Sequence, residues 1–370
     1  MRTIIFLLQK EFIQIFRNKM MLPIIIVIPI VQLLILSYTA TFEIKNVSLA
    51  FVDQDKTQTS KELKSRFEHS PFFNIYAEAD HISQLEKSML QQKVEMILVI
   101  PPDFEKQLTL SKKADLQLIV DAVNGSAANL MAGYANQIVL GFNTDIITNL
   151  TGINIKETGI QVAPRYWYNP ELDYKTYMVP GILVLLVSLI GAFLSGMNIV
   201  REKEIGTIEQ LNVTPIKKYQ FIAGKLFPFW LIAMFDLCFG LVIAKIVFAI
   251  PILGSVWLIL GVAAIYLILV LGLGLFISTI TDTQQQAMFL AWFFFVIFIM
   301  LSGLFTPVEA MPEWTQMLNI LNPIAYFIDF MRMVMLKGSD FTAVTSQILH
   351  ITVYALLTMG LAIWRYRKRA

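Results

Sequence analysis

Few residues of this chain have the type and surroundings that chemistry requires, and two of them stand inside apolar sequence. Asp236 and Lys245 interrupt a long hydrophobic stretch, where an ionisable side chain is costly and marks a functional or interhelical site. Nine residues separate the two, which places them on opposite faces of a helix and prevents them from pairing. Asp236 is therefore a candidate for an interhelical hydrogen bond or for a cation or proton path, and Lys245 can extend towards the membrane surface.

A second concentration of polar groups lies at 201–225, which begins with mixed charge directly after another apolar stretch. Ile205, Ile208 and Leu211 follow at helical spacing, so we expect the preceding helix to continue out of the apolar layer as an amphipathic rod. Thr214-Pro215 has the N-cap and N1 chemistry that begins a new short helix. The segment is predicted to form a compact projection that docks a partner protein; the alternative is a solvated loop with ordinary charge.

Known catalytic and metal-binding patterns are absent from the sequence. The single cysteine, Cys238, excludes a disulfide framework and a multi-cysteine metal site, and neither H-E-x-x-H nor G-x-S-x-G occurs. A phosphate-binding G-x-x-x-x-G-K-[ST] motif is also missing, since Gly224-Lys225 is followed by Leu226. Asp53-Gln54-Asp55 could hold a cation, although a solvated turn at a strand end is the favoured interpretation. We expect no catalytic residue, no metal and no cofactor bound by this chain.

These residues must be positioned by membrane-spanning helices. Hydrophobic residues make up 56% of the 370 residues and charged residues 15%, well below the roughly 25% of a soluble domain. With a net charge of +2, this composition excludes a disordered chain, a nucleic-acid-binding protein and an ordinary cytosolic enzyme. Six stretches are long and apolar enough to cross about 30 Å of hydrocarbon: 22–41, 178–200, 226–250, 255–279, 287–305 and 346–364.

Basic residues set the orientation of these spans. Thirteen Lys and Arg lie in the segments that face inward when the N-terminus is cytoplasmic, against two in the short outward segments. Both termini are therefore predicted to be cytoplasmic. Residues 1–21 are predicted to form a basic amphipathic helix along the inner membrane surface, which serves either as an anchor or as a lever towards a cytoplasmic partner.

The 135 residues of segment 42–176 separate the first two spans and are predicted to form an extracytoplasmic domain. Buried strands and helical patterns alternate along it, which favours a mixed α/β fold. Strands are expected at Val47–Asp53, Phe73–Ala77, Met96–Ile100, Leu116–Val120 and Val162–Trp167. Helices are expected at Ser60–Glu68, Ile82–Gln92, Phe104–Leu110 and Ala127–Leu150. The predicted fold is thus an α-helical polytopic membrane protein with six transmembrane helices and a mixed α/β domain inserted between the first and second.

Two shorter patterns concern how the later helices, within 177–370, pack. Small residues recur in the second span and favour a close helix contact, with the dimer seam as one place for it: Ser188, Gly191, Ala192 and Ser195. Ile324–Leu336, within the outward segment 306–345, is apolar but too short to span, so it either dips back into the outer leaflet or packs beneath the external domain. Asp329 and Arg332 lie three residues apart on this helix and can pair.

Motifs spread along the whole chain resemble those of one family. They are Lys10-Glu11-Phe12, Arg17-Asn18, Val52-Asp53-Gln54-Asp55, Val99-Ile100-Pro101-Pro102-Asp103-Phe104, Trp167-Tyr168-Asn169-Pro170-Glu171, Val179-Pro180-Gly181, the run from Ile199 to Pro215, Gly224-Lys225, Ser278-Thr279, Thr283-Gln284-Gln285-Gln286-Ala287, Leu301-Ser302-Gly303 and Pro307-Val308-Glu309-Ala310-Met311-Pro312. The chain resembles the membrane subunit of a type-2 ABC exporter, in the branch with a large external domain after the first span.

The resemblance implies a function and partners. Two such permease subunits, identical or different, would form a dimeric path in the bacterial inner membrane, driven by separate cytoplasmic ATPase subunits that bind ATP-Mg. Loop 201–220 would couple the two, and a periplasmic adaptor and an outer-membrane channel would complete the exporter. The substrates would be drugs or other small hydrophobic or cationic molecules. The docking residues would be Arg201, Glu202, Lys203, Glu204, Gly206, Thr207, Glu209, Thr214 and Pro215, and the outer gate would include Ser302, Gly303, Asp329 and Arg332.

Two other classes of protein fit the sequence less well. A membrane-anchored ligand sensor would use 42–176 to bind its ligand, but the largest predicted cytoplasmic segment is about 25 residues long, too short for a signalling domain. An intramembrane enzyme would need paired carboxylates, a metal cluster or a nucleophile with its base, and the spans carry none of these.

Overall fold

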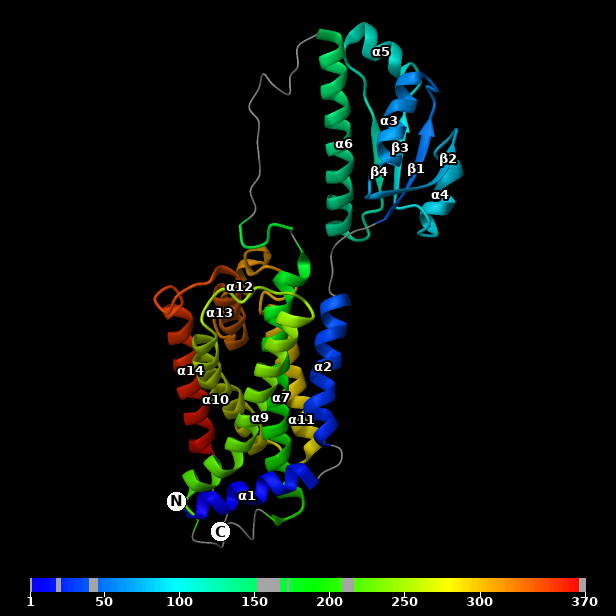
Figure 1. Cartoon of the computed structure of the whole chain (residues 1–370). Coiled ribbons are helices and arrows are strands. Elements are labelled where there is room, and N and C mark those ends of the chain that lie inside the picture. Colours follow the sequence, from blue (N-terminus) through cyan, green and yellow to red (C-terminus); the bar gives the residue numbers. More distant parts are fainter. Residues whose placement is uncertain are drawn as a thin grey trace. The chain divides into compact units, whose positions relative to one another are not determined.

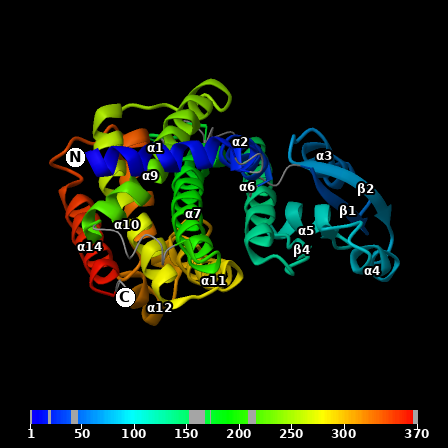
Figure 2. The same cartoon turned by 90° about the horizontal axis from the view of Figure 1, so that it is seen from below.

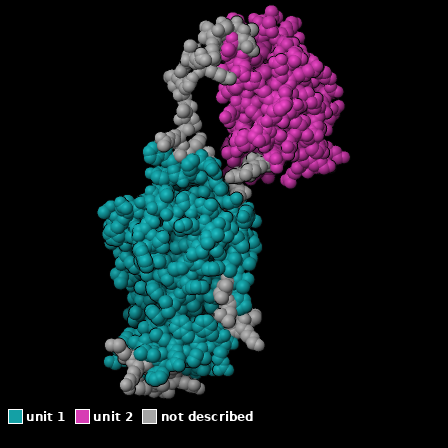
Figure 3. Space-filling model, viewed as in Figure 1, with its two compact units in different colours: residues 1–41, 165–370 teal, residues 42–164 magenta. Residues whose placement is uncertain are grey.

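The computed structural model describes residues 2–17, 21–39, 46–151, 167–171, 173–207 and 216–365. The chain divides into a helical unit, Met1–Thr41 with Arg165–Ala370, and an inserted unit, Phe42–Pro164, which Figure 3 colours separately. The insertion begins at the predicted residue 42 and ends before the predicted 176. The helix that follows it is capped by Asp173, whose carboxylate accepts from the Lys175 amide at 2.9 Å.

The helical unit contains every segment that was predicted to cross the membrane. Its long helices are α2 (Met21–Thr39), α7 (Tyr174–Glu204), α9 (Lys218–Ile246), α10 (Val256–Ile280), α11 (Gln284–Leu301) and α14 (Thr345–Arg365). The shorter ones are α1 (Arg2–Arg17), η1 (Val308–Ala310), α12 (Glu313–Asn319) and α13 (Pro323–Lys337). Among the described residues, five helices are long and apolar enough to cross a membrane, and α2 is the nineteen-residue helix at the first predicted span. The predicted helical membrane fold is confirmed.

Helix α7 forms the centre of the helical unit, as Figure 1 shows. It packs against α2, α9, α10, α11 and α13 and is buried along most of its apolar length. Its small residues meet α10: the hydroxyls of Ser188 and Tyr266 share a hydrogen bond, and Gly196 lies against the backbone of Gly274. The predicted close contact is therefore made inside the chain. Because α10 covers this stripe, the stripe is not available for a dimer seam.

Helix α13 is the apolar segment that was too short to span. Asn322 caps its first turn, Pro323 occupies the first helical position, and Gly338 ends the helix with a φ of 67°. Phe327 and Phe330 are fully buried, and Phe327 stacks on Tyr266 of α10 at a ring-centroid distance of 4.1 Å. The helix thus packs within the core of the helical unit.

The inserted unit is a three-layer α/β structure. Its strands are β1 (Val47–Asp53), β2 (Phe73–Ala79), β3 (Met96–Ile100) and β4 (Gln117–Val120), and its helices are α3 (Gln58–Glu68), α4 (Ser83–Leu90), α5 (Phe104–Ser111) and α6 (Gly125–Thr151). The sheet has the order β2-β1-β3-β4, with β4 antiparallel to β3 and the other pairs parallel. Alternate side chains of β1 and β3 pack against α3 and α6 on one face and against α4 on the other (Figures 1 and 2). The last predicted strand, at 162–167, lies outside the described residues except for Trp167.

The acidic pair that follows β1 is used internally. The Asp55 carboxylate accepts from the backbone amides of Phe104 and Glu105 at 2.9 and 3.1 Å and so caps the start of α5. Asp53 accepts from the Lys56 amide at 2.9 Å and from the Ser60 hydroxyl at 2.8 Å. Within the described part of the chain, no group of three His, Cys, Asp or Glu residues could hold a metal ion. These bonds support the interpretation of the pair as a strand-end turn.

The α7–α10 contact predicts a matched pair of variants on one helix. A side chain on Gly274 would bring Cβ within 2.7 Å of the Ala192 carbonyl oxygen, whereas a Cβ on Gly261 meets nothing within 4 Å. We expect Gly274→Leu to destabilise the protein by about 3 kcal/mol or more through overpacking and Gly261→Leu to leave stability nearly unchanged. The measurement is the thermal midpoint of the detergent-solubilised chain by fluorescence-detected gel filtration. Equal midpoints for the two variants would contradict the packing described.

Candidate functional site

Helix α1 lies across the end of the helical unit at which α7 ends and α9 begins, as Figures 1 and 2 both show. Its buried face carries Leu7, Glu11 and Ile15, one turn apart. Leu7 packs against Gly224 so closely that a Cβ there would lie 2.8 Å from the Cβ of Leu7. The glycine therefore allows α1 to approach α9 and brings the charged residues of the two helices together.

Four charged residues of α1, α7 and α9 form an ion cluster, defined here as Lys10, Glu11, Glu202 and Lys225. The Lys225 ammonium lies 2.7 Å from Glu11 Oε1 and 2.6 Å from Glu202 Oε1. It also donates to Asn198 Oδ1 at 3.0 Å. Glu11, Glu202 and Lys225 are each at most 3% exposed. Because an uncompensated charge in such a place is costly, the three groups depend on one another.

Lys10 completes the cluster from its solvent side. Its Nζ donates to Glu202 Oε1 at 2.7 Å and lies 3.5 Å from Glu11 Oε1. Burial alone would lower the pKa of the Lys10 amine, but the hydrogen bond and charge of Glu202, with the charge of Glu11, outweigh it and raise that pKa. Two lysines and two glutamates make the cluster neutral, which is the condition under which charges are tolerated in an interior. The cluster joins α1, α7 and α9.

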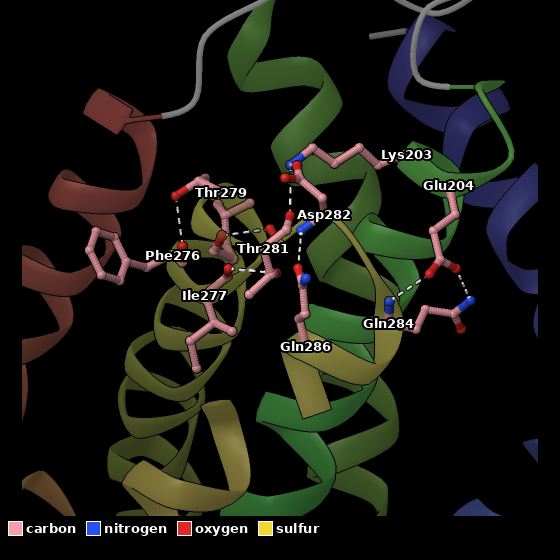
Figure 4. Close-up of polar contacts among 11 residues, drawn as sticks. Lys203, Glu204, Phe276, Ile277, Thr279, Thr281, Asp282, Gln284 and Gln286 are labelled. Carbon is pink, nitrogen blue, oxygen red and sulfur yellow. Dashed lines mark hydrogen bonds and ion pairs between the residues drawn. The ribbon is translucent and has the colours of Figure 1, made fainter. Parts of the chain in front are cut away.

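The next two residues of α7 bind a different element. Lys203 donates to the Thr281 carbonyl at 2.7 Å and to Asp282 Oδ1 at 2.8 Å. Glu204 accepts from the Gln284 amide at 2.8 Å and from the Gln284 side chain, and Figure 4 shows both sets of contacts. These contacts attach α7 to the connection between α10 and α11. The last turn of α7 therefore contacts three other elements at this end: α1, α9 and the α10–α11 connection.

The predicted amphipathic rod beyond α7 is not formed at its first residue. The helix ends at Glu204, and Gly206 adopts a φ of 79°, a left-handed conformation that terminates helices. The amides of Ile205 and Gly206 then bond back to the Arg201 and Lys203 carbonyls. Ile205 is exposed rather than part of a continuing stripe. The prediction was wrong here because hydrophobic spacing carries no information on the backbone conformation at Gly206.

The predicted docking residues separate into four groups. Glu202, Lys203 and Glu204 bind other parts of their own chain, and the Thr207 hydroxyl donates to the Glu202 carbonyl at 3.2 Å. Arg201 is exposed beside α1. Gly206 forms the left-handed turn that ends α7, and Glu209, Thr214 and Pro215 lie outside the described residues.

Sequence reasoning missed the ion cluster itself. The sequence placed Glu11 only in a family motif, and it placed Lys225 in a family motif and among the inward-facing basic residues. A signal was present: each is a charge set among apolar or small residues at positions where the helical pattern predicts a buried side chain. The partner could not be inferred, because Glu11, Glu202 and Lys225 are far apart in the sequence.

Asp236 lies in an apolar niche between helices. It is 6% exposed and borders a cavity of about 10 Å³ together with side chains of α2, α7 and α9. The other lining residues are all apolar: Pro29, Ile30, Leu33, Leu183, Leu186, Val187, Phe239, Gly240 and Ile243. Its Oδ2 has no hydrogen-bond partner among the described residues. Lys245 is exposed on the other side of the helix, as the spacing predicts.

The four predicted gate residues line one cavity at the opposite end of the helical unit. Ser302, Gly303, Asp329 and Arg332 border a space of about 740 Å³. Arg332 stacks on the Tyr177 ring at 3.7 Å and donates to the Tyr177 and Gly303 carbonyls at 3.2 and 3.0 Å. Asp329 accepts from Gln347 at 2.7 Å. The predicted Asp329–Arg332 pair is therefore replaced by contacts to other helices, because both side chains reach nearer partners.

Comparison with known proteins decides the family. The sequence matches the family described as ABC-2 family transporter protein over residues 19–364. The chain belongs to this family. It is 30% identical to the probable multidrug ABC transporter permease YbhR of Escherichia coli, over 98% of both chains. It is 27% identical to the corresponding permease YbhS over 97% of this chain and 95% of the relative. It is 26% identical to the inner membrane transport permease YhhJ over 86% and 85%.

Family membership and the apolar helices make this chain a multi-pass permease of the inner membrane. The resemblance that the sequence motifs carried is confirmed.

The ion cluster predicts that two lysines of α9 contribute very differently to the stability of the protein. Lys225→Met leaves the carboxylates of Glu11 and Glu202 buried without their shared cation and should cost about 3–5 kcal/mol of stability. Lys245→Met removes an exposed charge from the same helix and should cost less than about 1 kcal/mol. Adding Glu11→Gln to Lys225→Met should recover part of the loss. Thermal midpoints of the purified chain measure all three, and an additive double variant would rule out a coupled cluster.

The niche around Asp236 predicts that this carboxyl group acts in packing. Its surroundings offer no polar group to continue an ion path, and the cavity is barely large enough for one water molecule. Asp236→Asn should therefore keep transport within about twofold of wild type at equal expression. Dye efflux from cells is the measurement. A loss of transport in a variant with an unchanged thermal midpoint would instead assign Asp236 to the pathway.

Proposed function

We propose that this chain is the membrane half of an ATP-driven exporter of drugs and other small hydrophobic or cationic molecules. The names of its relatives support this: YbhR and YbhS are probable multidrug permeases, and a linearmycin resistance permease of Bacillus subtilis is 21% identical over 85% of this chain. A second permease subunit completes the path. That both YbhR and YbhS match supports either a pair of identical subunits or a pair of related ones.

The motor of this exporter is a separate subunit. The sequence holds no phosphate-binding loop, so ATP-Mg binds to a cytoplasmic ATPase that rests on the connection between α7 and α9. A periplasmic adaptor and an outer-membrane channel extend the path beyond the inserted unit, as the family resemblance implies. The predicted cytoplasmic position of both termini, which follows from the basic residues, puts this connection on the ATPase side.

The observation that carries the proposal is the last turn of α7. Three consecutive side chains there bind α1, α9 and the α10–α11 connection. Movement of the α7–α9 connection by an ATPase would therefore reach three further elements through short polar contacts rather than through a flexible loop. A solvated loop with ordinary charge would not need these contacts.

Exposed apolar side chains supply the contact surface for the ATPase. Ile205 is 64% exposed directly after α7, and Tyr219 is 60% exposed in the first turn of α9. A few buried anchors, among which tyrosine is enriched, carry most of the binding energy in protein interfaces. The internal contacts of Glu202, Lys203 and Glu204 hold the surface in place, while Glu209, Thr214 and Pro215 remain predicted docking residues.

The cavity at the other end of the helical unit fits the substrate class. Its volume of about 740 Å³ suits a drug-sized molecule. Tyr177 and Tyr326 offer aromatic surfaces to a hydrophobic or cationic molecule, and two carboxylates, Glu309 and Asp329, line the cavity together with the basic Arg332 and Lys337. We assign this cavity to the outer gate of the path.

One pair of variants tests the docking assignment. Ile205→Glu places a charge in the proposed ATPase contact, and Leu253→Glu places one at a 62% exposed position in the connection between α9 and α10. We expect Ile205→Glu to reduce co-purification of the ATPase and ATP-dependent ethidium efflux by about tenfold or more. Leu253→Glu should leave both unchanged.

The controls separate the parts of this proposal. Both variants should elute from gel filtration as wild type does, which excludes misfolding. If the wild-type chain exports ethidium without any ATP-hydrolysing partner, the exporter assignment fails. If Ile205→Glu and Leu253→Glu retain equal amounts of ATPase, the docking surface lies elsewhere.

A further inference from the structure

A groove runs between α1 and the end of α7, beside the ion cluster. It has a volume of about 550 Å³ and is lined by Lys10, Ile13, Gln14, Arg17 and Arg201. The polar α1 residues recur at i, i+4 and i+7 and therefore share one face of that helix. Three of the five lining side chains are basic and none is acidic, so the groove attracts anions.

The charges of this groove differ in how far they are already neutralised. Lys10 is committed to Glu202 and Glu11 in the ion cluster. Arg17 and Arg201 are exposed, and across the described part of the chain neither forms an ion pair. Two guanidinium groups therefore offer ten N–H donors without an anionic partner, in a fork geometry that matches phosphate oxygens.

The apolar surface next to the groove indicates that the groove lies at the membrane interface. Ile5, Phe6, Ile13 and Phe16 of α1 are 60, 68, 49 and 64% exposed, although Leu7, Glu11 and Ile15 of the same helix are buried. A helix with an apolar stripe turned away from its own protein lies in the membrane interface. Ile13 belongs both to this stripe and to the groove. An anion with an apolar chain attached would contact both the arginines and this stripe.

We propose that this groove binds the headgroup of an anionic phospholipid of the inner leaflet, with the phosphate between Arg17 and Arg201 and the acyl chains along Ile13 and Phe16. An acidic protein surface would also satisfy the arginines, but it would leave the apolar stripe of α1 without a partner. The lipid would connect α1 to α7 one residue away from Glu202 and so reinforce the ion cluster from the membrane side. The site does not depend on the proposed ATPase contact.

Native mass spectrometry of the purified full-length chain tests the site directly. The protein is incubated with phosphatidylglycerol and phosphatidylcholine of identical acyl chains, and bound lipid is counted as detergent is removed in the gas phase. We expect wild type to retain phosphatidylglycerol in preference to phosphatidylcholine. Each arginine contributes roughly a fivefold preference, so Arg17→Gln with Arg201→Gln should reduce the preference by roughly 25-fold.

Matched controls make the result decisive. Arg365→Gln removes an exposed arginine from the last residue of α14, at the same end of the helical unit, and should leave lipid retention unchanged (Figure 1). Glycerol 3-phosphate at equal concentration should not displace phosphatidylglycerol, which separates a lipid site from a free-phosphate site. The proposal is overturned if the double variant retains phosphatidylglycerol as wild type does. It is also overturned if glycerol phosphate competes fully, or if the double variant loses only ATPase binding.

Discussion

A single ammonium group organises the end of the helical unit at which α7 ends and α9 begins. Lys225 lies inside the protein, and its charge is tolerated only because Glu11 and Glu202 approach it from two other helices. Since each of the three residues would be an uncompensated buried charge without the others, the positions of α1, α7 and α9 are mutually determined. Packing among apolar side chains alone would permit α1 to slide along the end of the helical unit, whereas a shared salt bridge fixes its register.

The small residues of the helical unit also fix the positions of helices, through close packing rather than through charge. Gly224 lets α1 come close enough for Glu11 to reach Lys225, and Gly274 lets α10 come close to α7. Close backbone approach is favoured in membranes, where dispersion contacts and interhelical polar contacts replace the hydrophobic effect between helices. The permease therefore combines tight apolar contacts along its length with a polar junction at one end.

The sequence predicts those features that depend on local periodicity. The spans, the strand Val47–Asp53 and the strand Met96–Ile100 occur as expected, because side-chain burial there follows from the alternation or run of apolar residues. Features that depend on one backbone conformation or on distant partners escaped prediction. Helix α7 ends before Gly206, although the apolar spacing in the sequence continues beyond it. The partners of Arg332 are backbone carbonyl groups, which every residue carries and which the sequence therefore does not distinguish. The ion cluster required three separated positions to be known at once.

Helix α7 relates the two ends of the helical unit. Its 31 residues span about 46 Å at 1.5 Å per residue, with Glu202 in the ion cluster at one end and Tyr177, whose ring and carbonyl hold Arg332, at the other. Midway, Ser188 bonds Tyr266, which stacks on Phe327 of α13. Packed cores do not deform continuously, so a shift of one end of α7 is transmitted to the elements packed along it. The proposed coupling of an ATPase at one end to a gate at the other would use this continuous packing.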